Sequence, residues 1–155
     1  MAEQLSARHF RVTPDYGGFD LYDGDSDAGD PQVATAARSD VAAGNGYEIA
    51  IACAGIMAVN LTIEAWETAP DTDFTFWEGH RLLSLECPTG ILVISERTID
   101  TSVFELPEPG VYTVRVMYSG WQQMREAIHN FPITADRAQA LAGERYIIQF
   151  WPSSQ

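Results

Sequence analysis

The segment Ala58-Val-Asn-Leu-Thr-Ile-Glu-Ala-Trp-Glu67 alternates apolar and polar side chains along its whole length. Successive side chains of a β-strand point to opposite faces of the sheet, so this alternation predicts a strand with one buried face. The face predicted to be buried carries Val59, Leu61, Ile63 and Ala65. The opposite face carries polar groups and one large aromatic ring, Trp66. The segment therefore predicts a strand that lies between a hydrophobic core and solvent.

The same two-residue period recurs along the rest of the chain, broken by turns that contain glycine and proline. Further strands are predicted at His9–Thr13, Phe19–Tyr22, Tyr47–Cys53, Arg81–Cys87, Ile91–Glu96, Phe104–Leu106, Val111–Tyr118 and Arg145–Trp151. Tyr47 is predicted to point inward with the alternate residues that follow it, and Pro88-Thr89-Gly90 is predicted to close a hairpin. Short strands at this spacing predict a mainly β fold, an antiparallel β-sandwich of eight or nine strands that forms a single domain over residues 1–155.

Helical signals are few, and one or two short helices are expected. Gln32–Val41 is rich in alanine and precedes a glycine-rich turn. Thr134–Ala142 has a residue that can cap a helix at its start, and Gly143 can end it. Apolar residues within Trp121–Ile128 recur at helical spacing, which predicts a helical turn there.

The charge of the chain is strongly negative and unevenly placed. The 155 residues contain 22 acids and nine bases, a net charge of −13, and every base is arginine. Residues 12–80 hold 13 of the acids and a single base, Arg38. Nucleic acid phosphates and anionic membranes attract cations, so this charge argues against direct binding to either. A basic protein is the partner that the composition favours.

The cysteines and the amino terminus predict a cytoplasmic protein. Cys53 and Cys87 do not form a CxxC pair, and the opening MAEQLSARHF lacks the basic and then apolar pattern of a secretory signal. Apolar runs all fall short of the roughly 20 residues that a membrane-spanning helix needs. We therefore expect reduced thiols and no membrane segment.

Catalytic and cofactor signatures are missing from the sequence. It contains no GxSxG nucleophile elbow and no glycine-rich phosphate loop, and His9, His80 and His129 are scattered. No two histidines or cysteines have the spacing of zinc ligands. The sequence thus predicts a binding protein with no catalytic residue, metal or cofactor. An enzyme whose site is assembled from distant residues stays an alternative.

The segment from Asp23 to Asp30 has aspartates at positions 23, 25 and 27, followed by Gly29 and Asp30. Alternating acids resemble an EF-hand calcium loop, but Ala28 stands at the glycine position and Ala34 at the final glutamate position. Three interpretations stay open: a calcium-dependent binding module, a solvated acidic loop, and an acidic surface that faces a partner.

A second acidic stretch, from Glu64 to Trp77, is interleaved with aromatic side chains. Aromatic residues anchor many protein interfaces, and carboxylates can hold the arginine or lysine of a partner. The alternative is that these rings cover the open end of the core, which we favour for Phe74 and Phe76. The partner-binding candidates are Asp23, Asp25, Asp27, Asp30, Glu64, Trp66, Asp71, Asp73 and Trp77.

Two further segments resemble a known family. Phe104-Glu-Leu-Pro-Glu-Pro-Gly-Val-Tyr-Thr-Val-Arg115 is similar to the LPxGxY strand entry of the DNA-entry nuclease inhibitor family, also called competence protein J. Glu144-Arg-Tyr-Ile-Ile-Gln-Phe-Trp-Pro152 resembles the last strand of related small bacterial β-sandwich proteins, and Phe10-Arg-Val12 fits their opening strand. The resemblance implies an intracellular inhibitor, of the nuclease-inhibitor or immunity type, that blocks the active surface of a basic nuclease. It carries no inhibitory residue over to this chain.

Overall fold

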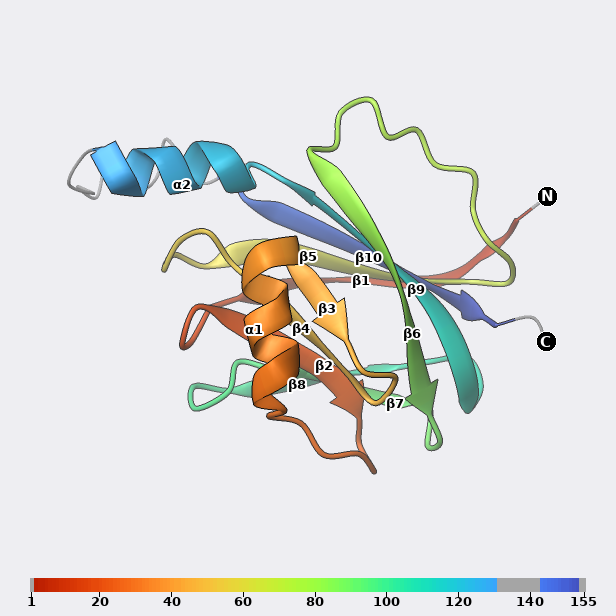
Figure 1. Cartoon of the computed structure of the whole chain (residues 1–155). Coiled ribbons are helices and arrows are strands. Elements are labelled where there is room, and N and C mark those ends of the chain that lie inside the picture. Colours follow the sequence, from red (N-terminus) through yellow and green to blue (C-terminus); the bar gives the residue numbers. More distant parts are fainter. Residues whose placement is uncertain (1, 131–142, 154–155) are drawn as a thin grey trace.

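The computed structural model of the chain describes residues 2–130 and 143–153. Within them, two five-stranded sheets pack face to face and two helices lie outside the sheets (Figure 1). The first sheet has the order β1 (Gln4–Val12), β5 (Val59–Trp66), β10 (Arg145–Pro152), β9 (Gly110–Ser119), β6 (Gly79–Cys87). The second has the order β3 (Ala42–Gly44), β4 (Glu48–Ala52), β2 (Gly18–Asp23), β7 (Ile91–Ser95), β8 (Thr101–Glu105). The predicted β-sandwich is confirmed, with ten strands in the described residues rather than eight or nine.

The strand predicted from residues 58–67 lies inside the first sheet. It is antiparallel to β1 and parallel to β10, with Ile63 opposite Ile148 in the parallel pair. Parallel neighbours need a long connection, and here the chain passes through both sheets between β5 and β10. All other pairs between the strands are antiparallel, as predicted.

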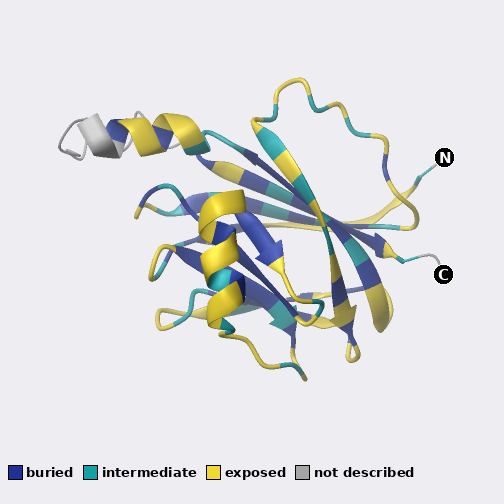
Figure 2. Cartoon of the chain, viewed as in Figure 1, coloured by how far each residue is buried: buried dark blue, intermediate teal, exposed yellow. Residues whose placement is uncertain are grey.

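The core fills the space between the two sheets and is built from alternate residues of their strands (Figure 2). The four residues predicted to line the inner face of β5 are all buried. Tyr146, Ile148 and Phe150 of β10 are at most 1% exposed, again as predicted. The prediction for Tyr47 is wrong: β4 begins one residue later, so this ring lies in the preceding turn and is 55% exposed.

The segment Pro88-Thr89-Gly90 does not close a hairpin, so that prediction is also wrong. β6 pairs with β9 in the first sheet, whereas β7 pairs with β2 and β8 in the second. The segment therefore carries the chain from one sheet to the other. Gly90 has a φ of 75°, and a Cβ there would lie 3.3 Å from a backbone nitrogen of the neighbouring loop, so glycine suits this sharp crossing.

The two helices differ in how they contact the sandwich: α1 packs on a sheet face, whereas α2 contacts the core through Trp121 at its start. α1 (Pro31–Asp40) begins at a capping residue, Asp30, and packs Val33 and Ala37 against the outer face of β3 and β4. α2 (Trp121–Asn130) extends the predicted helical turn. The helix predicted at Thr134–Ala142 lies outside the described residues. Neither described helix is long and apolar enough to cross a bilayer.

Truncation on the two faces of β5 tests this arrangement. Leu61→Ala removes a fully buried side chain between the sheets, and we expect the free energy of unfolding to fall by about 2–5 kcal/mol. Asn60→Ala, one position away on the half-buried outer face, is expected to cost less than about 1 kcal/mol. Urea denaturation measures both. Equal losses would contradict the assignment of the two faces.

Candidate partner-binding site

Three loops meet at one end of the second sheet and enclose a hollow of about 530 Å³. They are the segment between β2 and α1, the turn between β3 and β4, and the crossing between β6 and β7 (Figure 1). The lining residues are Asp25, Ser26, Asp27, Ala28, Asp30, Asn45, Tyr47, Glu48, Glu86 and Pro88. They include five acids and no base. We call this surface the acidic hollow.

Asp23, a candidate of the sequence analysis, lies beneath the hollow and not on it. Its side chain is fully buried. The carboxylate accepts hydrogen bonds from the backbone N–H groups of Thr89 and Gly90 at 3.1 Å each and from that of Asp25 at 2.9 Å. The Thr89 hydroxyl donates a further bond at 2.8 Å. Asp23 therefore joins two loops and is not available to a partner in this structure.

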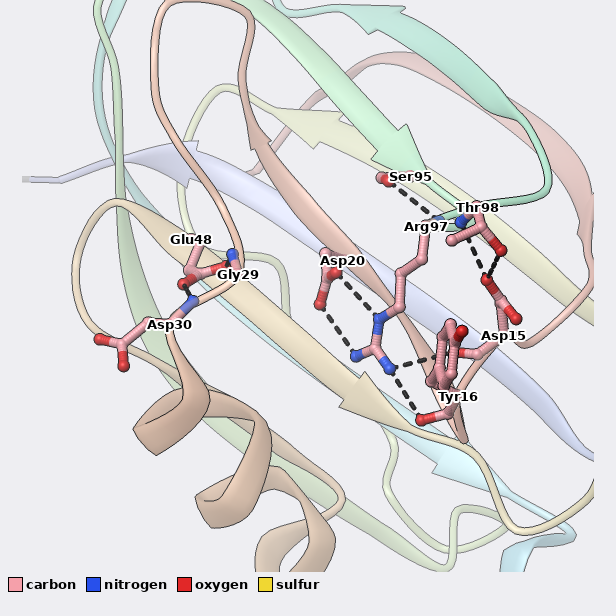
Figure 3. Close-up of polar contacts among 9 residues, drawn as sticks. All are labelled: Asp15, Tyr16, Asp20, Gly29, Asp30, Glu48, Ser95, Arg97 and Thr98. Atoms are coloured by element: carbon pink, nitrogen blue, oxygen red, sulfur yellow. Dashed lines mark hydrogen bonds and ion pairs between the residues drawn. The ribbon is translucent and has the colours of Figure 1, made fainter.

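Glu48 also fixes a loop through its carboxylate, on the other side of the hollow. It is 2% exposed, and its carboxylate accepts hydrogen bonds from Gly29 N at 2.9 Å and Asp30 N at 2.8 Å (Figure 3). Asp30 in turn caps α1 through Gln32 N and accepts a weaker bond from the Asn45 side chain at 3.3 Å. The acid-rich loop is thus fastened to the sheet by its own and neighbouring carboxylates.

The groups that remain open to a partner are Asp25, Asp27 and Glu86, all exposed, beside the exposed ring of Tyr47. Carboxylates pair with guanidinium and ammonium groups, and an aromatic ring can stack on a guanidinium. The sequence analysis missed Glu86 and Tyr47. No local signal places them near the Asp-rich loop, because the three loops meet only through the fold.

The described residues contain no set of ligands for the calcium ion that the Asp-rich loop suggested. No group of three or more histidine, cysteine, aspartate or glutamate side chains in residues 2–130 and 143–153 is arranged to hold a metal ion. The oxygens of Asp23, Asp30 and Glu48 already accept hydrogen bonds from N–H donors. The alternating acids resemble a calcium loop in sequence but are used differently in space.

The second set of candidates lies on the first sheet. Trp66 donates its indole N–H to Glu64 at 2.9 Å, and Glu64 also accepts a bond from the Gln149 amide at 3.0 Å. These side chains bond to one another across the outer face of the first sheet. They lie apart from the acidic hollow, and Figure 1 shows the loop after β5 at the opposite end of the molecule from the loop before α1.

The loop between β5 and β6 is held down by Arg115. Its guanidinium donates to Pro70 O, to the Thr72 hydroxyl and to the Gln149 side chain at 3.0–3.2 Å, and it lies 5.3 Å from the centre of the Phe74 ring. Burial lowers the pKa of this guanidinium. Phe74 stacks on His80 and lies outside the hydrophobic core cluster. Phe76 is 78% exposed, so the prediction that it covers the open end of the core is wrong.

The acids and the tryptophan of this loop lie at its surface. Asp71 and Asp73 are exposed, and the Asp73 pKa is lowered by hydrogen bonds from the Thr75 hydroxyl and amide. Trp77 is half-buried beneath the guanidinium of Arg145. Asp71 and Asp73 stay accessible to a partner, but at a different place from the hollow.

The thiols are poorly suited to nucleophilic chemistry. Burial raises the pKa of Cys87 to about 12 and raises that of Cys53 still further. A reactive cysteine needs a lowered pKa, because the thiolate is the nucleophile. The histidine nearest to Cys87 in the sequence, His80, stacks on the Phe74 ring, with ring centres 4.2 Å apart.

Glu144 is a buried acid that belongs to neither surface. Its carboxylate accepts hydrogen bonds from Ala54 N and the Tyr146 hydroxyl, each at 2.7 Å, and it is 4% exposed. Burial, the largest cause, raises the pKa of this carboxyl, and the hydrogen bonds offset only part of the rise. Burial also raises the pKa of the Tyr146 hydroxyl. Relative to the unfolded chain, folding therefore shifts the equilibrium of this carboxyl toward its neutral form.

Comparison with known proteins finds similarity in structure only. No protein-family model matches the chain, and no curated protein matches its sequence. The chain is similar in structure to ComJ from Bacillus subtilis, an inhibitor of the DNA-degrading activity of NucA, with a TM-score of 0.65 and 14% identity over 99% of each chain. It is also similar to a protein described as crocagin biosynthetic gene J, with a TM-score of 0.55 and 17% identity over 99% of each chain. The resemblance to the competence protein J family is confirmed at the level of the fold.

The role of Asp23 can be tested against its neighbour Asp25. Asp23→Asn replaces a buried acceptor of several N–H groups by an amide that presents its own donors to them. We expect a loss of about 1–3 kcal/mol in the free energy of unfolding and faster hydrogen exchange at Gly90. Asp25→Asn makes the same chemical change at an exposed site, where we expect less than about 0.5 kcal/mol. Similar losses in the two variants would contradict the structural role of Asp23.

Glu144 predicts a specific pH dependence. A carboxyl whose pKa is raised in the folded state contributes stability below its unfolded pKa, and that contribution is lost as the pH rises through the folded pKa. Glu144→Gln keeps an acceptor but cannot ionise. The variant should therefore gain stability relative to the parent protein as the pH rises above the ordinary glutamate range. Urea midpoints of both proteins across this range measure the difference, and a constant difference would contradict the prediction.

Proposed function

We propose that this protein is an acidic inhibitor, of the nuclease-inhibitor or immunity type, that binds a basic nuclease through the acidic hollow and covers its DNA-binding surface. The observation that carries the proposal is the likeness to ComJ over 99% of both chains, since that protein inhibits a DNA-degrading enzyme. On this proposal the protein acts by binding and not by catalysis.

The charges of the hollow support the choice of this surface. A nuclease must attract a polyanion, so the groups around its active site form a positive surface. Asp25, Asp27 and Glu86 present carboxylates around one concave surface that has no base among its lining residues. Such complementarity speeds encounter with the partner and disfavours wrong partners. It also makes the association sensitive to salt.

The shape of the hollow supports a protein partner. Asp23 and Glu48 fix the loop backbone from below, so little conformational freedom remains to be lost when a partner binds. Tyr47 provides an exposed ring at the rim, and tyrosine is enriched among residues that dominate binding energy at interfaces. The surface therefore combines fixed carboxylates with an aromatic anchor.

We also propose that the protein acts in the cytoplasm. Cys53 and Cys87 are both unpaired in the structure, as expected where thiols stay reduced. An inhibitor in that compartment protects the DNA of the cell that makes the nuclease.

Charge reversal at the hollow tests the proposal. The probe is the set of nucleases that a cation-exchange column retains from an extract of the source cells, with plasmid DNA as substrate. We expect the purified protein to inhibit DNA degradation, and inhibition to weaken as salt is raised. The triple variant Asp25→Lys, Asp27→Lys, Glu86→Lys should need at least about tenfold more protein for half-inhibition.

The matched control reverses three exposed acids of the other loop, Glu67→Lys, Asp71→Lys and Asp73→Lys, and thus changes the net charge by the same amount. We expect it to inhibit nearly as well as the parent protein. Equal loss in the two triple variants would remove the hollow as the binding site. Absence of inhibition by the parent protein, with the fold verified by its melting temperature, would refute the function itself.

A further inference from the structure

Three of the nine arginines line one pocket of about 260 Å³ beside the second sheet. Arg38 comes from the last turn of α1, Arg97 from the turn after β7, and Arg125 from α2. Tyr16 and Trp121 line the pocket beside them. In a chain with a net charge of −13, this is an unusual concentration of positive charge, and no local sequence pattern produces it. We call it the arginine pocket.

The backbone around this pocket is strained. Within the described residues, the non-glycine residues with positive φ are Tyr16 at 50°, Val41 at 71° and Arg97 at 59°. Tyr16 and Arg97 line the pocket, and the carbonyl of Val41 accepts a hydrogen bond from Ala52 N, which also lines it. A β-branched residue in this conformation is a genuine outlier. Such strain gathers at ligand sites, where the surrounding structure holds it in place.

Arg97 builds one wall of the pocket. Its guanidinium forms a bidentate pair with Asp20 at 3.0 and 3.1 Å and donates to the carbonyls of Asp15 and Tyr16 (Figure 3). Four of its five N–H groups are thus engaged. The Asp20 carboxylate balances its charge. Arg97 therefore fixes the loop that carries Tyr16 and leaves the binding of a ligand to other groups.

Arg38 and Arg125 are the lining arginines for which the described residues provide no ionic partner. Both are exposed, and no carboxylate of the described residues lies within ion-pair distance of either guanidinium. The Arg125 guanidinium lies 5.4 Å from the centre of the Trp121 ring, and both residues line the pocket. Planar guanidinium groups bind carboxylate and phosphate oxygens in pairs of parallel hydrogen bonds.

Small and apolar side chains, together with backbone, line the pocket between its arginines. Its walls include Ala34, Ala37 and Ile51. The Trp121 indole N–H donates to Ala52 O at 2.9 Å, and Cys53 N donates to Gly17 O at 2.8 Å. The first bond fixes the Trp121 ring, and both bonds satisfy backbone groups. Ala34 and Trp121 are partly exposed side chains that can contact the apolar part of a ligand.

We propose that the arginine pocket binds a small organic anion, with its carboxylate or phosphate on Arg38 and Arg125 and its apolar part against Ala34 and Trp121. The site is separate from the acidic hollow. β4 runs from Glu48 at the hollow to Ala52 at the pocket, four residue steps or about 13 Å. The anion site does not depend on the proposed inhibitor function.

Titrations followed by NMR test this proposal. The probes are benzoate, phenyl phosphate, inorganic phosphate and benzyl alcohol, and the signals are the Trp121 indole N–H and the amides of Gly17 and Cys53. We expect saturable shifts with benzoate or phenyl phosphate, and whichever binds more tightly identifies the oxyanion. Arg38→Gln with Arg125→Gln should raise the dissociation constant at least about tenfold, as loss of one charge-assisted hydrogen bond would.

The matched control is Arg8→Gln, which removes an exposed guanidinium stacked on an aromatic ring, Phe10, in the other sheet. It should bind the probes like the parent protein. Four results would overturn the proposal: no saturable shift with any anion, equal binding of benzyl alcohol, equal binding of inorganic and phenyl phosphate, or unchanged affinity in the double variant. Melting temperatures of all variants establish that each is folded.

Discussion

A carboxylate that leaves water must find hydrogen-bond donors, and this demand organises the loops of the molecule. The described residues include four acids that are at most 8% exposed: Asp20, Asp23, Glu48 and Glu144. Each lies in or beside a strand and accepts hydrogen bonds from a different loop. The strands fix the carboxylates, and the carboxylates fix the loops. Without these bonds, neither the acidic hollow nor the arginine pocket would keep its shape.

Buried carboxylates are satisfied in different ways at the two ends of the second sheet. At one end, Asp20 pairs with Arg97, and Arg38 and Arg125 line the pocket beside that pair. At the other end, Asp23 and Glu48 use backbone N–H groups instead of cations. Backbone donors satisfy a carboxylate without cancelling its full charge. The acidic hollow therefore keeps its negative charge although two of its lining acids, Asp30 and Glu48, are engaged in the fold.

The sequence predicted the strands well and their partners poorly. Alternation in β5, β9 and β10 is a local property, and the faces that it assigned are buried as expected. The pairing of a strand depends on residues far along the chain, which explains why Pro88-Thr89-Gly90 was expected to form a hairpin. The burial of the candidate acids also depends on residues far along the chain. Asp23 and Asp25 look equivalent in sequence, and only the approach of Thr89, 66 residues away, buries one of them.

The arginine pocket could not be predicted from the sequence for the same physical reason: its residues meet only through the fold. Arg38, Arg97 and Arg125 are far apart in the chain, and each would be read alone as a solvated base in an acidic protein. Their convergence depends on α1, the turn after β7 and α2 reaching the same end of β4. At 14% identity the likeness to ComJ shows the fold alone. A fold held by buried carboxylates can keep its sheets while its loops change, provided that each carboxylate finds another donor.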